Sequence, residues 1–224
     1  MTHLILLIGR SKIYPYICLV LVTLAFLSTN PLQDFDQRYA ISFVGSMCGL
    51  LCVILLAKRK NSGNVLGMMA AFGESTANFL GNNIGAALPS IFYFLSHVYG
   101  LVNWRKNQDT DKAVKVRQLK ENHFLTILFF LIIAAFLNVF LTTELEAKNT
   151  EYQLIANCFI FGLGLIAQLL LMMRFSFNWY LWILLNVLTI GLNIYTHNPI
   201  IATQYLIYLF NAIYGVIEWK KSQK

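Results

Sequence analysis

The stretch 208–219 reads YLFNAIYGVIEW, and 115 positions earlier the stretch 93–104 reads YFLSHVYGLVNW. Each begins with Tyr, contains a Tyr-Gly pair and ends on a Trp that two basic residues follow. Further residues recur upstream at the same spacing: Gly49, Leu50, Leu55, Leu56 and Arg59 match Gly164, Leu165, Leu170, Leu171 and Arg174. Self-similarity at one fixed spacing indicates that the chain contains two copies of one structural unit.

The composition places this unit in a membrane. Hydrophobic residues make up 58% of the chain and charged residues 12%, against roughly 45–50% and 25% in soluble proteins. Several apolar runs approach the roughly 17–25 residues of a membrane-spanning helix. We count runs at 13–28, 40–57, 63–80, 84–104, 124–142, 152–173, 178–195 and 199–219. We therefore predict an all-α polytopic membrane protein of about eight transmembrane helices, whose first run is a span and not a cleaved signal peptide.

The chain has a net charge of +7, and its charged residues alternate in sign from one loop between runs to the next. Basic residues gather after every second run, at 58–60, 105–120, 174 and 220–224, whereas the other loops are predominantly acidic. Cytoplasmic loops of membrane proteins are enriched in Lys and Arg, so the pattern predicts that both termini are cytoplasmic. It therefore indicates topology and no nucleic-acid partner. Four spans return the chain to its starting side, so the two copies should be parallel repeats.

No motif for catalysis, a cofactor or a metal stands out. The four cysteines, Cys18, Cys48, Cys52 and Cys158, all fall inside apolar runs without metal-site spacing. There is no Gly-rich phosphate loop, and no catalytic Ser/His/Asp or Cys/His constellation. We expect a protein that is not an enzyme, with no cofactor and no metal.

The positions at which the two copies differ indicate a binding site. Polar stripes follow the runs 178–195 and 63–80 in the same register: Trp182, Asn186, Thr189 and Asn193 match Gly67, Ala71, Glu74 and Asn78. Polar side chains facing lipid are costly, so both stripes should face a protein interior or a water-filled cavity. The large Trp182 and Asn186 opposite the small Gly67 and Ala71 predict an off-centre pocket.

Other polar residues extend this hypothesis. Gln204, Tyr208 and Asn211 form a polar face on the last run. Glu74 lies deep inside a run, where a carboxylate costs at least about 2.5–3.5 kcal/mol, so it is a functional candidate. Its alternatives are a protonated helix–helix hydrogen bond and a run that reaches water sooner. His97 is either a cavity residue or a packed, hydrogen-bonded histidine.

The residues that both copies share indicate scaffold. Gly100 and Gly215 each precede a Trp by four positions. Glycine allows close approach of helices, and we expect Trp104 and Trp219 to anchor the helix ends at the membrane interface.

Motifs of the second copy resemble those of PnuC-type vitamin transporters. They are Gln168 with Arg174, then Trp179-x-x-Trp182-x-x-x-Asn186, then the closing Tyr-Leu-x-Asn-x-x-Tyr-Gly-x-x-x-Trp run. The resemblance covers most of 40–222 and implies two parallel three-helix bundles joined by a linking helix, as in SWEET-type transporters. The expected segments are 1–39 (N-terminal helix and first outer loop), 40–107 (first repeat), 108–151 (basic cytoplasmic loop and linking helix 124–142) and 152–224 (second repeat).

The resemblance also implies facilitated diffusion of nicotinamide riboside across a bacterial inner membrane, trapping by cytoplasmic phosphorylation, and a homotrimer. Trp182, Asn186, Tyr208 and Asn211 match the family's binding motifs, and we add Gln204, Glu74, Asn78, Trp179, Gln168 and His97 as substrate-binding candidates. The pyridinium of nicotinamide riboside is a cation, on which aromatic rings can stack.

Two departures leave the substrate open. Ser96-His97 stands where the family usually has Met-Gln, and Pro89 stands where it has Asn. Relatives carry thiamine, riboflavin or deoxynucleosides, and thiamine is also a cationic aromatic molecule. The alternative of a different class is a non-transporting assembly or sensor protein, in which the polar stripes only pack helices. A membrane-embedded enzyme is a third alternative, which Glu74 without a metal-ligand cluster disfavours.

Overall fold

The computed structural model describes residues 2–27, 37–80, 84–119, 151–195 and 199–222. Within these ranges the regular structure is helical, apart from isolated β-bridges. The helices are α1 (Thr2–Arg10), α2 (Tyr14–Leu27), α3 (Gln37–Ala57), α4 (Ser62–Leu80), α5 (Ile84–Lys106), α7 (Glu151–Met172), α8 (Asn178–Tyr195) and α9 (Pro199–Lys221). The predicted linking helix 124–142 lies outside the described residues.

The helices α2 to α5 and α7 to α9 coincide with predicted runs to within about three residues at each end. The sequence did not predict α1, which is too short for a span and is bent by 81° from α2. Ser11 stands at the bend, where its Oγ accepts a hydrogen bond from the backbone N–H of Ile13. The first predicted run is therefore preceded by a separate short helix.

By length and hydropathy, α3 is the one described helix that could cross a membrane unaided, and α1 and α2 qualify only as a bent pair. Small and polar residues interrupt the apolar sequence of α4 and α8. A helix that turns such residues toward a protein interior does not need to be apolar all round.

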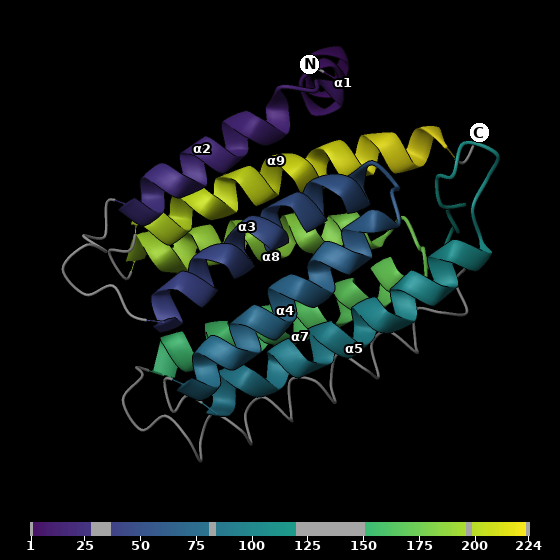
Figure 1. Ribbon diagram of the computed structural model, residues 1–224. Coiled ribbons are helices and arrows are strands. Elements are labelled where there is room, and N and C mark those ends of the chain that lie inside the picture. Colours follow the sequence, from purple (N-terminus) through teal and green to yellow (C-terminus); the bar gives the residue numbers. More distant parts are fainter. Residues whose placement is uncertain (1, 28–36, 81–83, 120–150, 196–198, 223–224) are drawn as a thin grey trace.

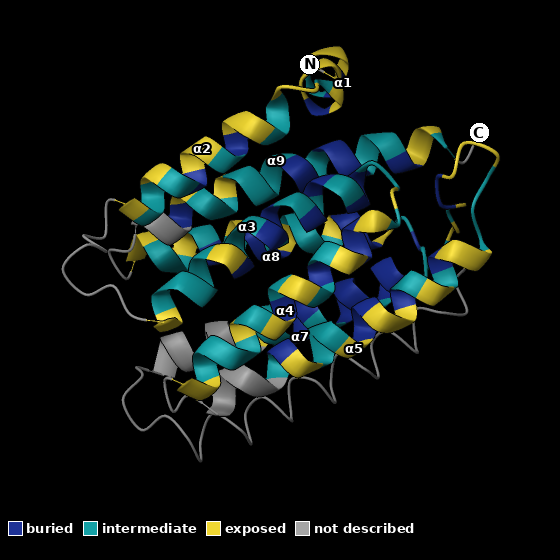
Figure 2. Cartoon of the chain, viewed as in Figure 1, coloured by how far each residue is buried: buried dark blue, intermediate teal, exposed yellow. Residues whose placement is uncertain are grey.

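Six of the described helices close into a ring through their contacts, and Figure 1 shows the helices of this bundle from the side. In chain order α3 packs on α4 and α4 on α5, while α7 packs on α8 and α8 on α9. Contacts of α5 with α7 and of α9 with α3 complete the ring. The remaining helices lie outside it, α2 against α3 and α9, and α1 against α9. The outward face of α2 is exposed and carries apolar side chains, as a lipid-facing helix would (Figure 2).

The helices α3 and α7 end in the same way. Arg59 and Arg174 have positive φ angles of 60° and 70°. At the end of α3 the backbone N–H groups of Arg59 and Lys60 donate hydrogen bonds to the carbonyl oxygens of Leu56 and Leu55. At the end of α7 those of Arg174 and Phe175 donate in the same way to Leu171 and Leu170. This is the Schellman arrangement, with the left-handed residue just after the helix. The Leu-Leu and Arg residues that recur at the fixed spacing thus form the same helix end in both copies.

The segment 107–119 runs from the end of α5 across both of these helix ends. The backbone N–H of Val114 donates to the carbonyl oxygen of Arg59, and that of Arg117 donates to the carbonyl oxygen of Arg174. Val114 is fully buried in a hydrophobic cluster with Leu56 and Leu171. The segment therefore covers the end of the ring at which α3 and α7 terminate.

The prediction that Trp104 and Trp219 anchor the helix ends at the membrane interface is wrong. Both side chains are 0% exposed, because they pack on each other and donate hydrogen bonds to backbone carbonyl oxygens of other helices. The close approach predicted at the glycines is found: a Cβ on Gly100 would collide with Met172, and one on Gly215 with Trp179.

Candidate functional site

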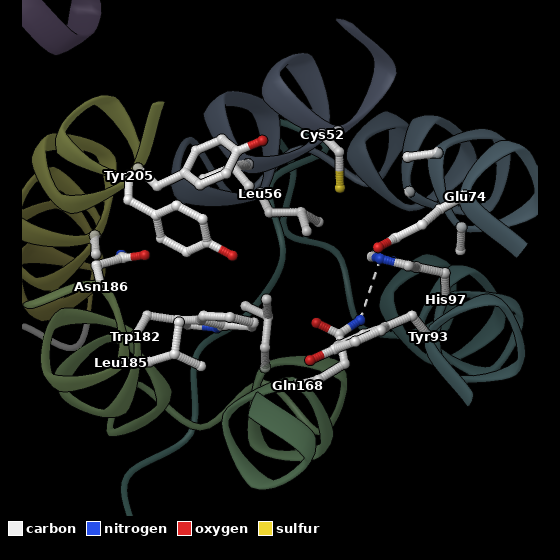
Figure 3. A pocket seen from close by; sticks show the side chains of 18 of the residues that line it. Cys52, Leu56, Glu74, Tyr93, His97, Gln168, Trp182, Leu185, Asn186 and Tyr205 are labelled. Atoms are coloured by element: carbon white, nitrogen blue, oxygen red, sulfur yellow. Dashed lines mark hydrogen bonds between the residues drawn. The ribbon is translucent and has the colours of Figure 1, made fainter. Parts of the chain in front are cut away.

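A cavity of about 400 Å³ lies inside the ring (Figure 3). Every ring helix contributes to its wall: Cys52 and Leu56 come from α3, Glu74 from α4, Tyr93 and His97 from α5, Gln168 from α7, Trp182 and Asn186 from α8, and Tyr205 and Tyr208 from α9. The volume falls in the roughly 300–1,000 Å³ range of small-molecule sites. The six helices thus form one site between the two halves of the chain.

Most of the residues that the sequence singled out lie on this wall. Those that line the cavity are Glu74, His97, Gln168, Trp179, Trp182, Asn186 and Tyr208. The pairing of Trp182 and Asn186 with Gly67 and Ala71 is also found, since all four residues line the same cavity. The register of the α4 and α8 stripes therefore brings both polar faces to one place.

Asn78, Gln204 and Asn211 are not among the lining residues. Gln204 instead donates a hydrogen bond to the Tyr208 hydroxyl oxygen at 2.9 Å. Asn211 is buried and donates to the backbone carbonyl oxygen of Ile207. The face of α9 that lines the cavity carries Tyr205, Tyr208 and Ala212. This face shares Tyr208 with the predicted stripe and is otherwise rotated away from it.

The sequence analysis missed Tyr93 and Tyr205, which also line the cavity. Tyr93 had a signal, because it is the match of Tyr208 at the fixed spacing. Tyr205 had none, since one more aromatic residue in an apolar run carries no pattern of its own. Together with Tyr208 they give the wall three tyrosine rings.

Glu74 supplies the one acidic side chain on the described wall, which includes no Lys, Arg or Asp. It is exposed, and its carboxyl group points into the cavity (Figure 3). Its helix continues to Leu80. Ser90 on α5 hydrogen-bonds to the carboxyl group. The arrangement favours a ligand that is cationic or rich in hydrogen-bond donors.

Two indole groups at the cavity are unsatisfied. Within the described part of the chain, Nε1 of Trp179 and Nε1 of Trp182 are buried and have no hydrogen-bond partner. A buried donor without a partner costs about 1–3 kcal/mol. Both residues line the cavity through other atoms of their rings, because neither Nε1 is exposed to it. A ligand oxygen would accept these hydrogen bonds only after the indoles had moved.

His97 combines both of its predicted alternatives, because it lines the cavity and is also packed and hydrogen-bonded. Its Nδ1 lies 3.0 Å from Oδ1 of Asn64, and its Nε2 lies 3.1 Å from Nε2 of Gln168. The ring rests on Gly67, where any Cβ would collide with it. Of the two residues that differ from the family pattern, His97 therefore lies on the cavity wall, and Ser96 accepts a hydrogen bond from the wall residue Gln168.

A family model described as "Nicotinamide mononucleotide transporter" matches residues 39–221, which is most of the chain. The protein belongs to this family. The resemblance to PnuC-type transporters seen in the sequence is thereby confirmed. The family consists of transporters and not of enzymes, and its members cross the membrane several times, so this chain is a multi-pass membrane protein.

Named relatives agree with this assignment. Nicotinamide riboside transporter PnuC of Haemophilus influenzae is 26% identical over 188 residues, which cover 82% of this chain and 80% of the relative. The protein of the same name from Neisseria mucosa is 24% identical over 202 residues, with 85% and 75% covered. A solved structure, "Crystal structure of the Vitamin B3 transporter PnuC", has a TM-score of 0.70 at 21% identity and matches 97% of this chain and 95% of its own. That structure shows that the family fold extends over almost the whole chain.

Proposed function

We propose that this protein carries nicotinamide riboside across the membrane by facilitated diffusion and that phosphorylation in the cytoplasm then prevents its return. The observation that carries the proposal is the cavity wall, which combines one acid, Glu74, with aromatic rings and, among the described residues, includes no Lys or Arg. A pyridinium ring has a fixed positive charge, and aromatic faces attract such cations. The names of the curated relatives support the same substrate.

The wall favours the nucleoside over its phosphate, although the family description names the mononucleotide. A phosphate group carries about −1.5 to −2 charges at pH 7. On the described wall it would meet Glu74 and find no Lys or Arg, and an unpaired buried charge is strongly unfavourable. Nicotinamide riboside lacks this group.

The polar groups of the wall suit the rest of the molecule. Trp182 and Tyr208 would stack on the pyridinium for about 0.5–2 kcal/mol each. Asn186 and Gln168, which line the cavity, would bind the carboxamide and the ribose hydroxyls. Glu74 would meet the positive charge or a ribose hydroxyl.

We infer that the six ring helices form two parallel repeats of the SWEET type, with the cavity at their interface. Equivalent bonds support this: Trp104 donates to the carbonyl oxygen of Met172, and Trp219 to that of Leu56. Each bond joins the C-terminal ends of two helices, as parallel neighbours require. Rocking of one repeat against the other would open the cavity to each side in turn.

The end of the ring covered by the segment 107–119 is the cytoplasmic end in this proposal. Lys58, Lys106 and Lys220 follow or end the helices that terminate there, and such basic loops mark the cytoplasmic side. The ion pair of Arg10 with Glu218, at 2.9 Å, holds α1 near the C-terminal end of α9. It supports placing both termini on this side. A homotrimer remains the expected assembly, testable by native mass spectrometry.

Uptake into proteoliposomes tests the function. Saturable, bidirectional flux of labelled nicotinamide riboside that ignores proton and sodium gradients is expected, because Glu74 is the one acid on the described wall. A binding screen on the purified protein should rank nicotinamide riboside above thiamine, riboflavin and deoxynucleosides. Thiamine, also a cationic aromatic molecule, is the runner-up. Flux of none of these vitamins would refute the transporter and favour an assembly or sensor protein.

A further inference from the structure

A chain of hydrogen bonds runs from a backbone carbonyl group to the cavity wall. It starts at Leu101, whose carbonyl oxygen accepts a hydrogen bond from Nδ2 of Asn61 at 3.1 Å. Asn61 Oδ1 accepts from Nδ2 of Asn64 at 2.9 Å. Asn64 Oδ1 then lies 3.0 Å from Nδ1 of His97, and His97 Nε2 lies 3.1 Å from Nε2 of Gln168.

The direction of every bond in this chain follows from its first member, since a carbonyl oxygen can only accept. Asn61 must turn its NH₂ group to Leu101, so its oxygen faces Asn64. Asn64 in turn presents its own oxygen to His97. A neutral His97 therefore carries its proton on Nδ1 and offers the lone pair of Nε2, which only an N–H of Gln168 can fill.

A second contact fixes the Gln168 amide in the same orientation. Ser96 Oγ donates to the backbone carbonyl oxygen of Tyr93 at 2.7 Å, so this hydroxyl oxygen accepts from Nε2 of Gln168 at 2.9 Å. Both N–H groups of the Gln168 amide are therefore used, one by Ser96 and one by His97. Within the described residues its Oε1 accepts no hydrogen bond, and Figure 3 shows the Gln168 amide at the cavity wall, bonded to His97.

We propose that His97 is a positioning residue that sets the selectivity of the cavity by holding the carbonyl oxygen of Gln168 toward the ligand. The site then takes a nucleoside whose base carries a hydrogen-bond-donating primary amide, and it rejects the corresponding carboxylate. The proposal rests on the proposed function and deepens it. The two ligands to compare are nicotinamide riboside and nicotinic acid riboside, which differ only in this group.

The physical reason is the lack of a donor for a carboxylate at this place. An amide NH₂ would donate to Gln168 Oε1, whereas a carboxylate would face that oxygen in a cavity that also holds Glu74. Sites built to pair with a donor reject analogues that lack it by large factors, because buried groups are left unpaired. We expect a preference for the amide of roughly 100-fold.

Isothermal titration of both ligands to the purified full chain tests the inference. His97→Phe removes both ring nitrogens and leaves Ser96 as the remaining described contact of the Gln168 amide. The Ser96 hydroxyl can accept from the amide nitrogen or donate to the amide oxygen, so the amide can then turn, and the preference should shrink to less than about tenfold. His97→Gln can still donate to Asn64 and accept from Gln168, so it should restore most of the preference. Leu95→Ala, on the exposed side of the same helix, is the control and should keep it.

A merely structural role for His97 would weaken both ligands equally in His97→Phe. That result, or a His97→Gln variant that behaves like His97→Phe, would overturn the inference. If His97→Phe does not fold, the comparison of the two ligands on the wild-type protein still tests the inference. Equal affinity of the wild type for the amide and the carboxylate would refute it, even when nicotinamide riboside binds. Failure of the wild type to bind any candidate vitamin refutes the proposed function instead.

Discussion

Trp104 and Trp219, 115 positions apart in the chain, meet edge to face with ring centroids 5.7 Å apart. Each donates its indole N–H to a backbone carbonyl oxygen across the ring, Trp104 to Met172 and Trp219 to Leu56, both at 3.2 Å. The residues by which the two halves resemble each other are thus the residues that fasten one half to the other.

Replacing either tryptophan by Phe should weaken this connection. Trp219→Phe keeps an aromatic ring but removes one of the two donors to the carbonyl oxygen of Leu56, which keeps the backbone N–H of Arg59, so the cost should be about 0.5–1.5 kcal/mol. Trp104→Phe should cost a similar free energy of unfolding, and each variant should lower the thermal midpoint of the purified protein. The double variant should depart from additivity, because the rings touch. Tyr16→Phe, at an exposed position, is the control, and unchanged midpoints for both Trp variants would contradict the prediction.

The matched helix ends give a prediction that separates backbone from side chain. Arg59 and Arg174 adopt positive φ angles, which cost an L-residue roughly 1 kcal/mol and glycine almost nothing. Each side chain also bonds to the segment 107–119, Arg59 to Val114 and Arg174 to Lys115. Arg59→Ala and Arg174→Ala lose these bonds and keep the strain.

The corresponding glycine variants lose the same bonds but relieve the strain. We therefore expect Arg59→Gly and Arg174→Gly to melt at higher temperature than the alanine variants at the same positions, by about 1 kcal/mol of stability. Thermal unfolding monitored by tryptophan fluorescence measures the difference. Glycine variants less stable than the alanine variants would show that the backbone at these helix ends is not strained.

Much of the fold could be predicted because it rests on local pattern. The apolar runs gave seven helices their places, and the fixed spacing marked the residues at the ends of α3 and α7. The buried contact of Trp104 with Trp219 could not be predicted, since a Trp beside basic residues is also typical of a helix end at the membrane interface. Nor could the path of the segment 107–119, which depends on bonds to helix ends distant in sequence.

The site shows the same division. The stripes on α4 and α8 predicted wall residues, because helical spacing fixes which residues share a face. On α9 the predicted stripe reaches the cavity through Tyr208 alone, because the helix turns Tyr205 and Ala212 toward the cavity in place of Gln204 and Asn211. A polar residue in an apolar helix can bond to its own helix, as Asn211 does to Ile207, and the sequence alone does not separate that use from ligand binding.

Glu74→Gln should separate cationic from neutral ligands. The change keeps the size of the side chain and removes its charge, so the affinity for nicotinamide riboside should fall by about tenfold. Binding of a neutral deoxynucleoside or riboflavin, if detectable, should change little. Isothermal titration measures both, with Glu218→Gln, outside the cavity wall, as the control. An equal loss for charged and neutral ligands would remove Glu74 from charge recognition.

Trp182→Ala tests the aromatic wall. Removal of the indole takes away a stacking surface and an unpaired N–H donor, so nicotinamide riboside should bind at least about tenfold more weakly. Leu184→Ala, two positions further on the same helix and exposed, should bind normally. Folded protein is checked by size-exclusion chromatography. Unchanged affinity in a folded Trp182→Ala variant would exclude the indole from the binding site.

Gly67→Ala tests whether the place of the His97 ring matters for binding. The added Cβ would collide with the ring, which is held on both nitrogens and cannot move without losing a hydrogen bond. Overpacking of this kind costs about 1–3 kcal/mol, so affinity for nicotinamide riboside should fall at least about fivefold by isothermal titration. Gly191→Ala is the matched control, because a Cβ there meets nothing within 4 Å, and alanine in a helix is if anything stabilising. Equal affinities of the two variants would show that the cavity tolerates a displaced His97.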